Sequence, residues 1–416
     1  MNEDPAASSI ARNAASLVGG RLLAKAVFVV VTFQVTRHLG KERQGAYSVA
    51  LAYLVLFEFL ATLGLHYLLQ RECAARPPEA ASLLGRARAL WLRVAVVTPF
   101  LVVLPSALHG DSQEVTHAIA AGSVGLLFQA LGSIYNAVLV AQERMGRVAA
   151  IEAVSTVARA GLCLGVIWMD GSIGAFMACY TLSQMLYYLL AWASCPVRPA
   201  RVEGAELGSL LRQATPFAIM MLANGLYYMM GVVILQRLKS SVETGLYDAA
   251  WRPVNELMTL GYLIAASFFP RLVSLALRDA RAFKRLTAKA VVILLVLGGV
   301  AGAVGSVFAD ALIRLAYGRD FASSAWLLRI VCGCLAAYLP ACALTFAIVA
   351  TGRSWFWTAL LVMKAAVSIT LHLALVPTWG ARGTATAMLS AEVAAFLACA
   401  VAWAVLAPRD GQPPPP

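Results

Sequence analysis

The sequence predicts an all-α integral membrane protein with about twelve transmembrane helices, arranged as two six-helix lobes related by a pseudo-twofold axis along the membrane normal. Composition, the length of the apolar segments and an internal repeat lead to this prediction. Of the 416 residues, 61% are hydrophobic and 13% are charged, whereas soluble globular proteins carry about 25% charged residues. The composition excludes a soluble enzyme, a disordered protein and a secreted disulfide scaffold.

A spanning helix needs about 20 predominantly apolar residues, and no loop between such segments is long enough for a soluble domain. The predicted spans are residues 13–36, 46–69, 90–108, 116–141, 149–169, 173–194, 210–236, 245–269, 287–313, 326–351, 355–376 and 383–407. Most of the eight cysteines lie inside apolar stretches, so we interpret them as small buried side chains.

An internal repeat divides the chain into two halves. Gly45-Ala46-Tyr47 follows the first span, and Gly245-Leu246-Tyr247 follows the seventh, at an offset of 200 residues. Six spans in each half make both halves enter the membrane in the same direction, which is one known transporter plan. We expect an N-terminal lobe over residues 1–200 and a C-terminal lobe over residues 201–416, which ends in a short disordered tail.

The basic residues predict the orientation of the chain in the membrane. Nineteen Lys and Arg residues lie at the termini and in the loops that follow even-numbered spans, against eight in the opposite loops. The positive-inside rule therefore places both termini in the cytoplasm. The basic segment 278–289 fits either an amphipathic helix lying on anionic headgroups or charge that only sets topology.

Several charged residues fall inside predicted spans of the N-terminal half. A charge at the bilayer centre costs about 2.5–3.5 kcal/mol on insertion scales, so such residues usually face a lumen or a partner. Arg21 and Lys25 lie four residues apart in the first span, as a cationic wall or as side chains that snorkel to the headgroups. Glu58 is a single acid in the second span, and Arg159 shares one helix face with Glu152 in the fifth.

The C-terminal half carries a second set of charges. Asp248, Arg252, Asn255 and Glu256 share one face of the span 245–269, which fits a structural ion pair or a substrate contact equally well. Lys364 shares a face of its span with Ser368 and His372. Glu392 is a single acid in the last span, and it fits either a proton carrier or a buried acid that is already hydrogen-bonded.

The chain lacks the sequence motifs of several common enzyme classes. It contains no HExxH motif, no P-loop, no nucleophile elbow and no paired carboxylates in an outer loop. We therefore expect no catalytic residues, metal, cofactor or nucleic-acid partner.

Several short motifs resemble a known family. They are Gly20-Arg21, Leu39-Gly40, Gly45-Ala46-Tyr47-Ser48, Thr215-Pro216-Phe217, Gly245-Leu246-Tyr247-Asp248-Ala249-Ala250-Trp251-Arg252, Phe269-Pro270-Arg271, Tyr317-Gly318, Ala350-Thr351-Gly352-Arg353 and Pro377-Thr378-Trp379-Gly380-Ala381-Arg382-Gly383. In this order they resemble the Wzx-type polysaccharide biosynthesis flippases of the MATE-like superfamily of multidrug, oligosaccharidyl-lipid and polysaccharide exporters. This superfamily also includes the lipid II flippases.

The resemblance implies a MATE-like fold with a V-shaped cavity that opens alternately to each side. The implied function is to flip an undecaprenyl-diphosphate-linked oligosaccharide from the cytoplasmic to the periplasmic leaflet, for lipopolysaccharide or exopolysaccharide biosynthesis. Its implied location is the bacterial inner (plasma) membrane, and its implied partners are membrane lipids and the glycosyltransferases and polymerase of the same pathway. Arg21 and Arg252 fall where basic residues recur in relatives. By contrast, Thr62 stands where relatives often have an acid.

These considerations give one set of candidate site residues and one alternative function. The candidate cavity residues are Arg21, Lys25, Arg159, Asp248, Arg252, Asn255, Glu256 and Lys364, and the candidate coupling acids are Glu58 and Glu392. The alternative function is a MATE-type, cation-coupled small-molecule exporter. That alternative predicts unpaired acids in the cavity, whereas the acids of the fifth and eighth spans have basic partners on the same helix face.

Overall fold

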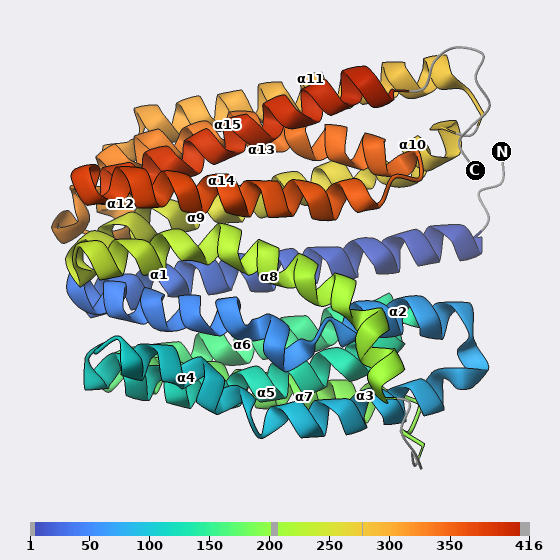
Figure 1. Ribbon diagram of the computed structural model, residues 1–416, viewed down its shortest axis with the longest axis horizontal. Helices are drawn as coiled ribbons and strands as arrows, with labels where there is room; N and C mark the ends of the chain where they lie inside the picture. The colour runs from blue at the N-terminus through green and yellow to red at the C-terminus, as the bar shows by residue number, and fades with distance from the viewer. Residues whose placement is uncertain (1–4, 201–206, 277, 408–416) are drawn as a thin grey trace. The chain divides into compact units, whose positions relative to one another are not determined.

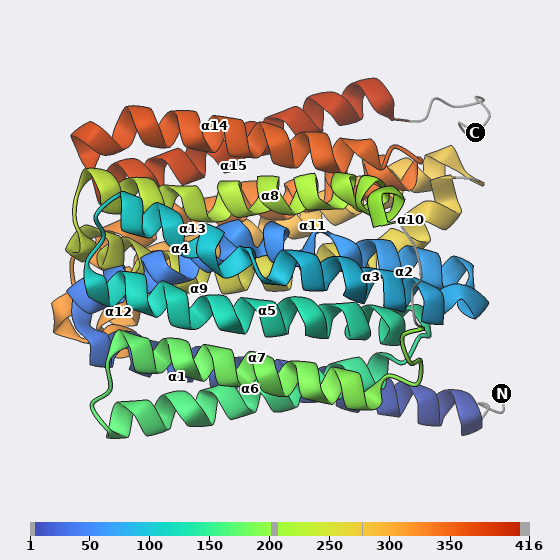
Figure 2. The same ribbon diagram turned by 60° about the horizontal axis from the view of Figure 1, so that its bottom comes forward.

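A computed structural model describes residues 5–200, 207–276 and 278–407, with side chains from Ala24 onward (Figures 1 and 2). Within the described residues, eleven helical segments are long and apolar enough to cross a membrane. The protein is therefore a multi-pass membrane protein, as the composition predicts.

The first predicted span and most of the second lie in one element, α1 (Pro5–Thr62), which bends at Gly40. Gly40 leaves the helical conformation with φ 68° and ψ 171°, a region that glycine enters without the strain of a Cβ. The parts of α1 before and after the bend run in opposite directions (Figure 1). Counting these two parts separately turns the eleven apolar segments into the predicted twelve spans.

The first compact unit comprises residues 1–39 and 50–222. After α1 it contains α2 (Leu65–Ala75), the short helix η1 (Pro77–Glu79), α3 (Ala80–Ala95), α4 (Thr98–Leu108), α5 (Gln113–Ala141), α6 (Met145–Trp168), α7 (Ile173–Ser194) and the start of α8 (Leu207–Leu238). Helix α5 is central, because α2, α4 and α7 all pack against it. Gly125 lets α7 approach closely, since a Cβ there would lie 2.9 Å from the Thr181 Cα.

The second compact unit comprises residues 40–49 and 223–416. It contains the rest of α8, then α9 (Ser241–Ser267), α10 (Phe269–Ala276), α11 (Ala280–Val307), α12 (Ala309–Tyr317), the short helix η2 (Arg319–Phe321), α13 (Ser324–Ala350), α14 (Trp355–Trp379) and α15 (Ala381–Leu406). Helix α13 is central here, because α9, α11 and α15 pack against it. Most of its side chains are buried, so it forms the core of this unit.

The two units share one packing order. Helices α5 and α13 are the fourth predicted spans of their halves, and each packs against the sixth span of its half, α7 or α15. The fifth spans, α6 and α14, pack against those same sixth spans. This agreement follows from the sequence repeat. The lobe boundary at residues 200 and 201 stays a prediction.

The structure corrects one expectation about the basic segment 278–289. Asp279 caps α11, because its Oδ1 accepts a hydrogen bond of 2.9 Å from the Ala282 backbone N–H, and the helix then continues unbroken to Val307. The basic residues from Arg281 onward are therefore the first turns of a membrane-crossing helix. An amphipathic helix that lies in the membrane plane is wrong for this segment.

Candidate functional site

Asp248 and Arg252 form an ion pair one turn apart on α9. The Arg252 Nε donates to the Asp248 Oδ2 at 2.5 Å, and both side chains are mostly buried. A buried charge is tolerated only when it is paired and hydrogen-bonded. Each residue therefore compensates the cost of burying the other's charge. Of the two interpretations that the sequence left open, the structure contains the ion pair. A role in substrate contact stays a prediction.

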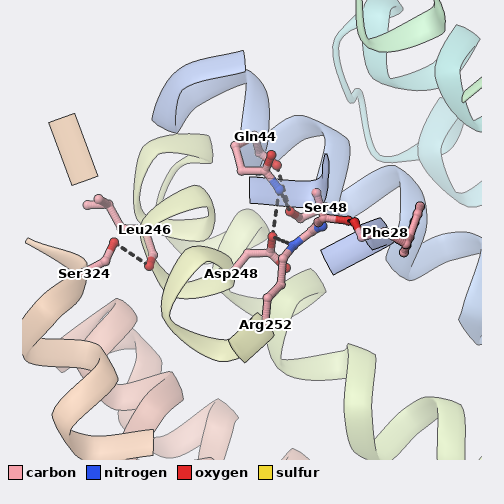
Figure 3. Close-up of polar contacts among 8 residues, drawn as sticks. Phe28, Gln44, Ser48, Leu246, Asp248, Arg252 and Ser324 are labelled. Carbon is pink, nitrogen blue, oxygen red and sulfur yellow. Dashed lines mark hydrogen bonds and ion pairs between the residues drawn. The ribbon is translucent and has the colours of Figure 1, made fainter. Parts of the chain in front are cut away.

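Gln44 and Ser48, in the residues that follow the α1 bend, complete this cluster (Figure 3). The Gln44 Nε2 donates to the Asp248 Oδ2 at 2.8 Å and to the Ser48 Oγ at 3.1 Å. The Arg252 guanidinium also lies 5.8 Å from the centre of the Tyr47 ring, within the range of a cation–π contact. Asp248 therefore accepts two hydrogen bonds through one oxygen, from partners that lie 204 and 4 residues away in the chain.

Two repeat-related glycines bring these residues together. A Cβ on Gly45 would lie 1.8 Å from the Ser241 carbonyl oxygen, and a Cβ on Gly245 would lie 1.9 Å from the Lys41 carbonyl oxygen. Lys41 and Ser241 are themselves 200 residues apart, like the glycines. The two segments thus cross in a reciprocal backbone contact that only glycine permits. We call residues 40–49 with 240–249 the glycine crossing.

The remaining predicted residues of α9 lie about one turn beyond Arg252. Asn255 and Glu256 are half-buried, and the Asn255 carbonyl accepts a 2.9 Å hydrogen bond from the Thr259 hydroxyl. The N-terminal end of α9 is tied to α13 by the Ser324 hydroxyl, which donates to the Leu246 carbonyl at 2.8 Å (Figure 3). The ion pair is therefore held on a helix that is fixed against the core of its unit.

Lys364 and Glu392 form a second, fully buried ion pair in the same unit. The Lys364 Nζ lies 3.0 Å and 3.1 Å from the two Glu392 carboxylate oxygens. The Tyr227 hydroxyl donates to Glu392, and the ammonium lies 4.0 Å from the centre of the Tyr227 ring. The structure fits the interpretation of Glu392 as a buried acid that is already hydrogen-bonded. The sequence does not pair Glu392 with Lys364, because the two residues lie on neighbouring helices, 28 positions apart in the chain.

In the first unit, Glu58 is hydrogen-bonded by a neutral amide. The Gln129 Nε2 donates to the Glu58 Oε1 at 2.8 Å, and the Gln129 Oε1 accepts from the Tyr180 hydroxyl at 2.5 Å. The Arg159 guanidinium lies 5.0 Å from the centre of the Phe28 ring and 5.1 Å from that of Tyr180. Glu58, Gln129 and Tyr180 thus form a polar chain, with Arg159 against the last ring.

Of the two cations in the first predicted span, only Lys25 has a side chain among the described residues. Lys25 is half-buried on α1, whereas the side chain of Arg21 lies outside the described residues. Among the residues that were described, no group of three or more His, Cys, Asp or Glu side chains is arranged to hold a metal ion.

Several members of these clusters were missed by sequence reasoning. For Ser48, the repeat offers a signal, because Ser48 corresponds to Asp248 at the 200-residue offset. Gln129 is a polar residue inside an apolar span and is recognisable on that ground. Nothing in the sequence pairs Tyr227 with Glu392, because that contact depends on how α8 packs against α15.

Comparisons with known proteins address the family and the fold. The sequence profile described as polysaccharide biosynthesis protein matches residues 10–276. The structure is similar to an inward-facing multidrug resistance MATE family transporter of the MOP superfamily, with a TM-score of 0.74, 14% identity and coverage of 91% of this chain and 94% of that chain. No curated protein sequence matches the chain.

Two further solved structures have the same fold. The lipid II flippase MurJ, in an inward closed conformation, gives a TM-score of 0.74 at 14% identity, with 92% of this chain and 87% of that chain covered. A MOP superfamily transporter from Pyrococcus furiosus gives a TM-score of 0.57 at 13% identity, with 94% and 96% covered. The all-α, MATE-like fold that the sequence predicts is therefore confirmed.

Proposed function

Because the chain belongs to the polysaccharide biosynthesis protein family, we propose that it flips a polyprenyl-diphosphate-linked oligosaccharide between the leaflets of a bacterial inner membrane. The family match over residues 10–276 is the observation on which this proposal depends. It is supported by a fold shared with a lipid II flippase. We further propose undecaprenyl as the lipid, alternating access as the mechanism, and transport from the cytoplasmic to the periplasmic leaflet.

The physical task is to carry a diphosphate and its sugars through hydrocarbon while the polyprenyl chain stays in lipid. A cationic surface lowers the cost of this passage, since Arg offers bidentate contacts to phosphate oxygens and Lys offers a point charge. Following the sequence prediction, we assign the diphosphate to Arg21, Lys25 and Arg252, and the sugars to Arg159, Asn255 and Glu256. Lys364 is left out of this assignment, because Glu392 neutralises it.

The Asp248 carboxylate has a specific part in this proposal. It balances the Arg252 charge in the absence of substrate through the 2.5 Å contact, so the empty site does not leave an uncompensated buried cation. A diphosphate that reaches Arg252 competes with Asp248 for the same guanidinium. The Gln44 amide then remains as the hydrogen-bond donor to Asp248, at 2.8 Å.

Of the two candidate coupling acids, Glu58 fits that role better. Glu392 is held by an ammonium at 3.0 Å, so protonating it would leave Lys364 as a buried, unpaired cation. The partner of Glu58 is the Gln129 amide, which accommodates both the charged and the protonated carboxyl group. We propose that any proton coupling uses Glu58. We also propose that glycosyltransferases of the same pathway supply the substrate and that a polymerase consumes it.

A headgroup-translocation assay in reconstituted vesicles tests this proposal. We expect Arg252→Gln, and the double variant Arg21→Ala with Lys25→Ala, each to lower the translocation rate by about tenfold or more, since charge-assisted contacts to phosphate are the strongest ones lost. Arg329→Gln is the matched control, because Arg329 forms a partly exposed ion pair with Asp310 elsewhere in the unit. Wild-type rates in both cavity variants would overturn the diphosphate assignment.

A MATE-type exporter of small cations is the second candidate, favoured by the equal TM-score of 0.74 to a multidrug transporter. The drug sensitivity of a deletion strain, measured together with its lipid-linked oligosaccharide, separates the two functions. The flippase predicts unchanged drug sensitivity in a deletion strain and lipid-linked oligosaccharide trapped in the cytoplasmic leaflet. Increased drug sensitivity without trapped oligosaccharide would favour the exporter instead.

A further inference from the structure

Helix α11 carries a surface stripe that changes from cationic to aliphatic along its length. Arg281, Arg285 and Lys289 are exposed in its first turns. Val292, Val296 and Val300 follow, each with 58% of its surface exposed. We call these six residues the α11 stripe. A row of exposed valines is typical of a helix surface that contacts lipid tails.

Helical geometry places the six residues on one side of α11. At 3.6 residues per turn they fall within a sector of about 100°. The opposite side is buried and includes Phe283, Ala290, Leu294 and Gly298. Gly298 packs so closely that a Cβ there would lie 2.3 Å from the Leu335 carbonyl oxygen of α13. The helix is thus fixed on one side and leaves the stripe open on the other.

We propose that the α11 stripe binds one anionic phospholipid, with its phosphate at Arg281, Arg285 and Lys289 and an acyl chain along Val292, Val296 and Val300. The stripe matches this ligand because its cations come first and its valines follow along the helix, as the phosphate and the acyl chain follow each other in a phospholipid. At 1.5 Å per residue, the three cations extend about 12 Å along the axis, and the valines extend about 12 Å more after a step of about 4.5 Å. The valine part alone fits within the hydrocarbon depth of one leaflet, about 15 Å.

The charges around the stripe leave it positive. Asp279 lies two residues before Arg281 and caps the helix at Ala282 through its Oδ1, so it places one negative charge beside three positive ones. Arg278 and Arg271 are exposed on the adjoining segment and add two positive charges. In the orientation predicted from the loops, this end faces the cytoplasmic leaflet, whose anionic lipids attract basic segments next to the membrane.

The equivalent helix of the other half provides an internal comparison. Helix α3 begins the third span, as α11 begins the ninth. Arg88 and Leu92 of α3, and Val96 directly after its end, form an exposed series. Only one cation precedes the aliphatic residues on that line, and the exposed Arg93 lies away from it by about 140° at 3.6 residues per turn. Charge that serves topology alone does not require three cations in one line, as α11 has.

The experiment uses the purified full-length protein in a neutral detergent, with phosphatidylglycerol as the probe. Native mass spectrometry counts bound lipid, and the shift in thermal midpoint on lipid addition reports its effect on stability. We expect the triple variant Arg281→Gln, Arg285→Gln, Lys289→Gln to weaken phosphatidylglycerol binding by about tenfold or more. Arg88→Gln with Arg93→Gln is the control, and it should bind as the wild type does.

Three further measurements keep the proposal open to refutation. Replacing both arginines of the stripe by lysine retains the charge and should retain binding, which separates lost binding from lost folding. Phosphatidylcholine should give no shift in thermal midpoint. Glycerol 3-phosphate should not compete at the same concentration, because it has no acyl chain to contact the valines.

Two results would overturn the proposal. In one, the triple variant and the wild type bind phosphatidylglycerol equally. In the other, glycerol 3-phosphate competes as well as the lipid does, which would identify a phosphate site without a lipid. Neither result concerns the oligosaccharide assay, because the probe carries no sugar and no polyprenyl chain, so the proposed function stands or fails separately.

Discussion

Lys364 and Glu392 show how one residue pair can remove net charge from the middle of a membrane protein. The carboxylate accepts from the ammonium at 3.0 Å and from the Tyr227 hydroxyl, and Glu392 has no exposed surface. Desolvating two charges costs several kcal/mol per ion, so the pair persists only while both members and the tyrosine remain. The pair therefore gives α14 and α15 a specific register.

Removing one member of this pair should be much worse than removing both. We expect Lys364→Met to destabilise the protein by about 3–5 kcal/mol, because it leaves the Glu392 carboxylate buried and unpaired. The double variant Lys364→Met with Glu392→Leu should recover most of that loss. Thermal midpoints of the three proteins in one detergent check this, and additive losses in the double variant would contradict it.

Cys73 on α2 offers a test of burial outside the membrane-spanning segments. Burial raises the pKa of the Cys73 thiol to about 11, so the thiol stays protonated near neutral pH. A maleimide should label this position at pH 7.5 only after denaturation. Between pH 9 and pH 11 the thiol ionises in the unfolded chain but stays protonated in the folded one. Ionisation therefore favours the unfolded chain, and the free energy of unfolding falls as the pH rises through this range. Rapid labelling of the folded protein at pH 7.5 would contradict this.

The sequence predicted single-helix contacts far better than contacts between helices. Asp248 and Arg252 lie four positions apart on one helix, so their pairing follows from helical geometry. Lys364 and Glu392 are equally polar, but their contact depends on the packing of α14 against α15. Gln44 was missed for the same reason, since it reaches Asp248 from a bend 204 residues away.

At the scale of elements, the glycine crossing determines how the bend of α1 meets α9. The reciprocal spacing of Gly45 and Gly245 against the carbonyls of Ser241 and Lys41 follows the 200-residue repeat. Backbone contact this close also holds the Gln44 amide 2.8 Å from Asp248. The motif that marks the repeat in the sequence is therefore the one that closes this contact.

Alanine at either glycine should separate the two segments. Because a Cβ would lie 1.8–1.9 Å from a backbone oxygen, Gly45→Ala and Gly245→Ala should each cost about 1–3 kcal/mol or more through overpacking. Gly299→Ala is the control, since nothing lies within 4 Å of a Cβ there. Thermal midpoints give the comparison, and unchanged values for both crossing variants would show that this contact is dispensable.

Helix ends were harder to predict than helices. The span predicted over 287–313 is divided between α11 and α12, because Phe308 leaves the helical conformation with φ −93° and ψ 13°. The span 245–269 likewise continues as α10 after a break at Phe268. Apolar composition runs through both breaks, so hydropathy alone gives no signal for them.

For the whole molecule, the charge distribution predicts an orientation that the fold alone does not specify. Helix α5 offers a matched pair of positions, because Gln113 and Gln142 lie at its two ends and both are exposed. All eight native cysteines are free and buried, so they should contribute little background to thiol labelling. An impermeant maleimide applied to intact cells therefore reads which end of α5 faces outward.

With the termini in the cytoplasm, Gln113 lies on the outer side and Gln142 on the cytoplasmic side. We expect Gln113→Cys to be labelled in intact cells, and Gln142→Cys to be labelled only after the membrane is permeabilised. The reason is that nineteen basic residues lie on the predicted cytoplasmic side against eight on the other. The reverse labelling pattern would place the termini outside, and it would move the cationic end of the α11 stripe to the outer leaflet.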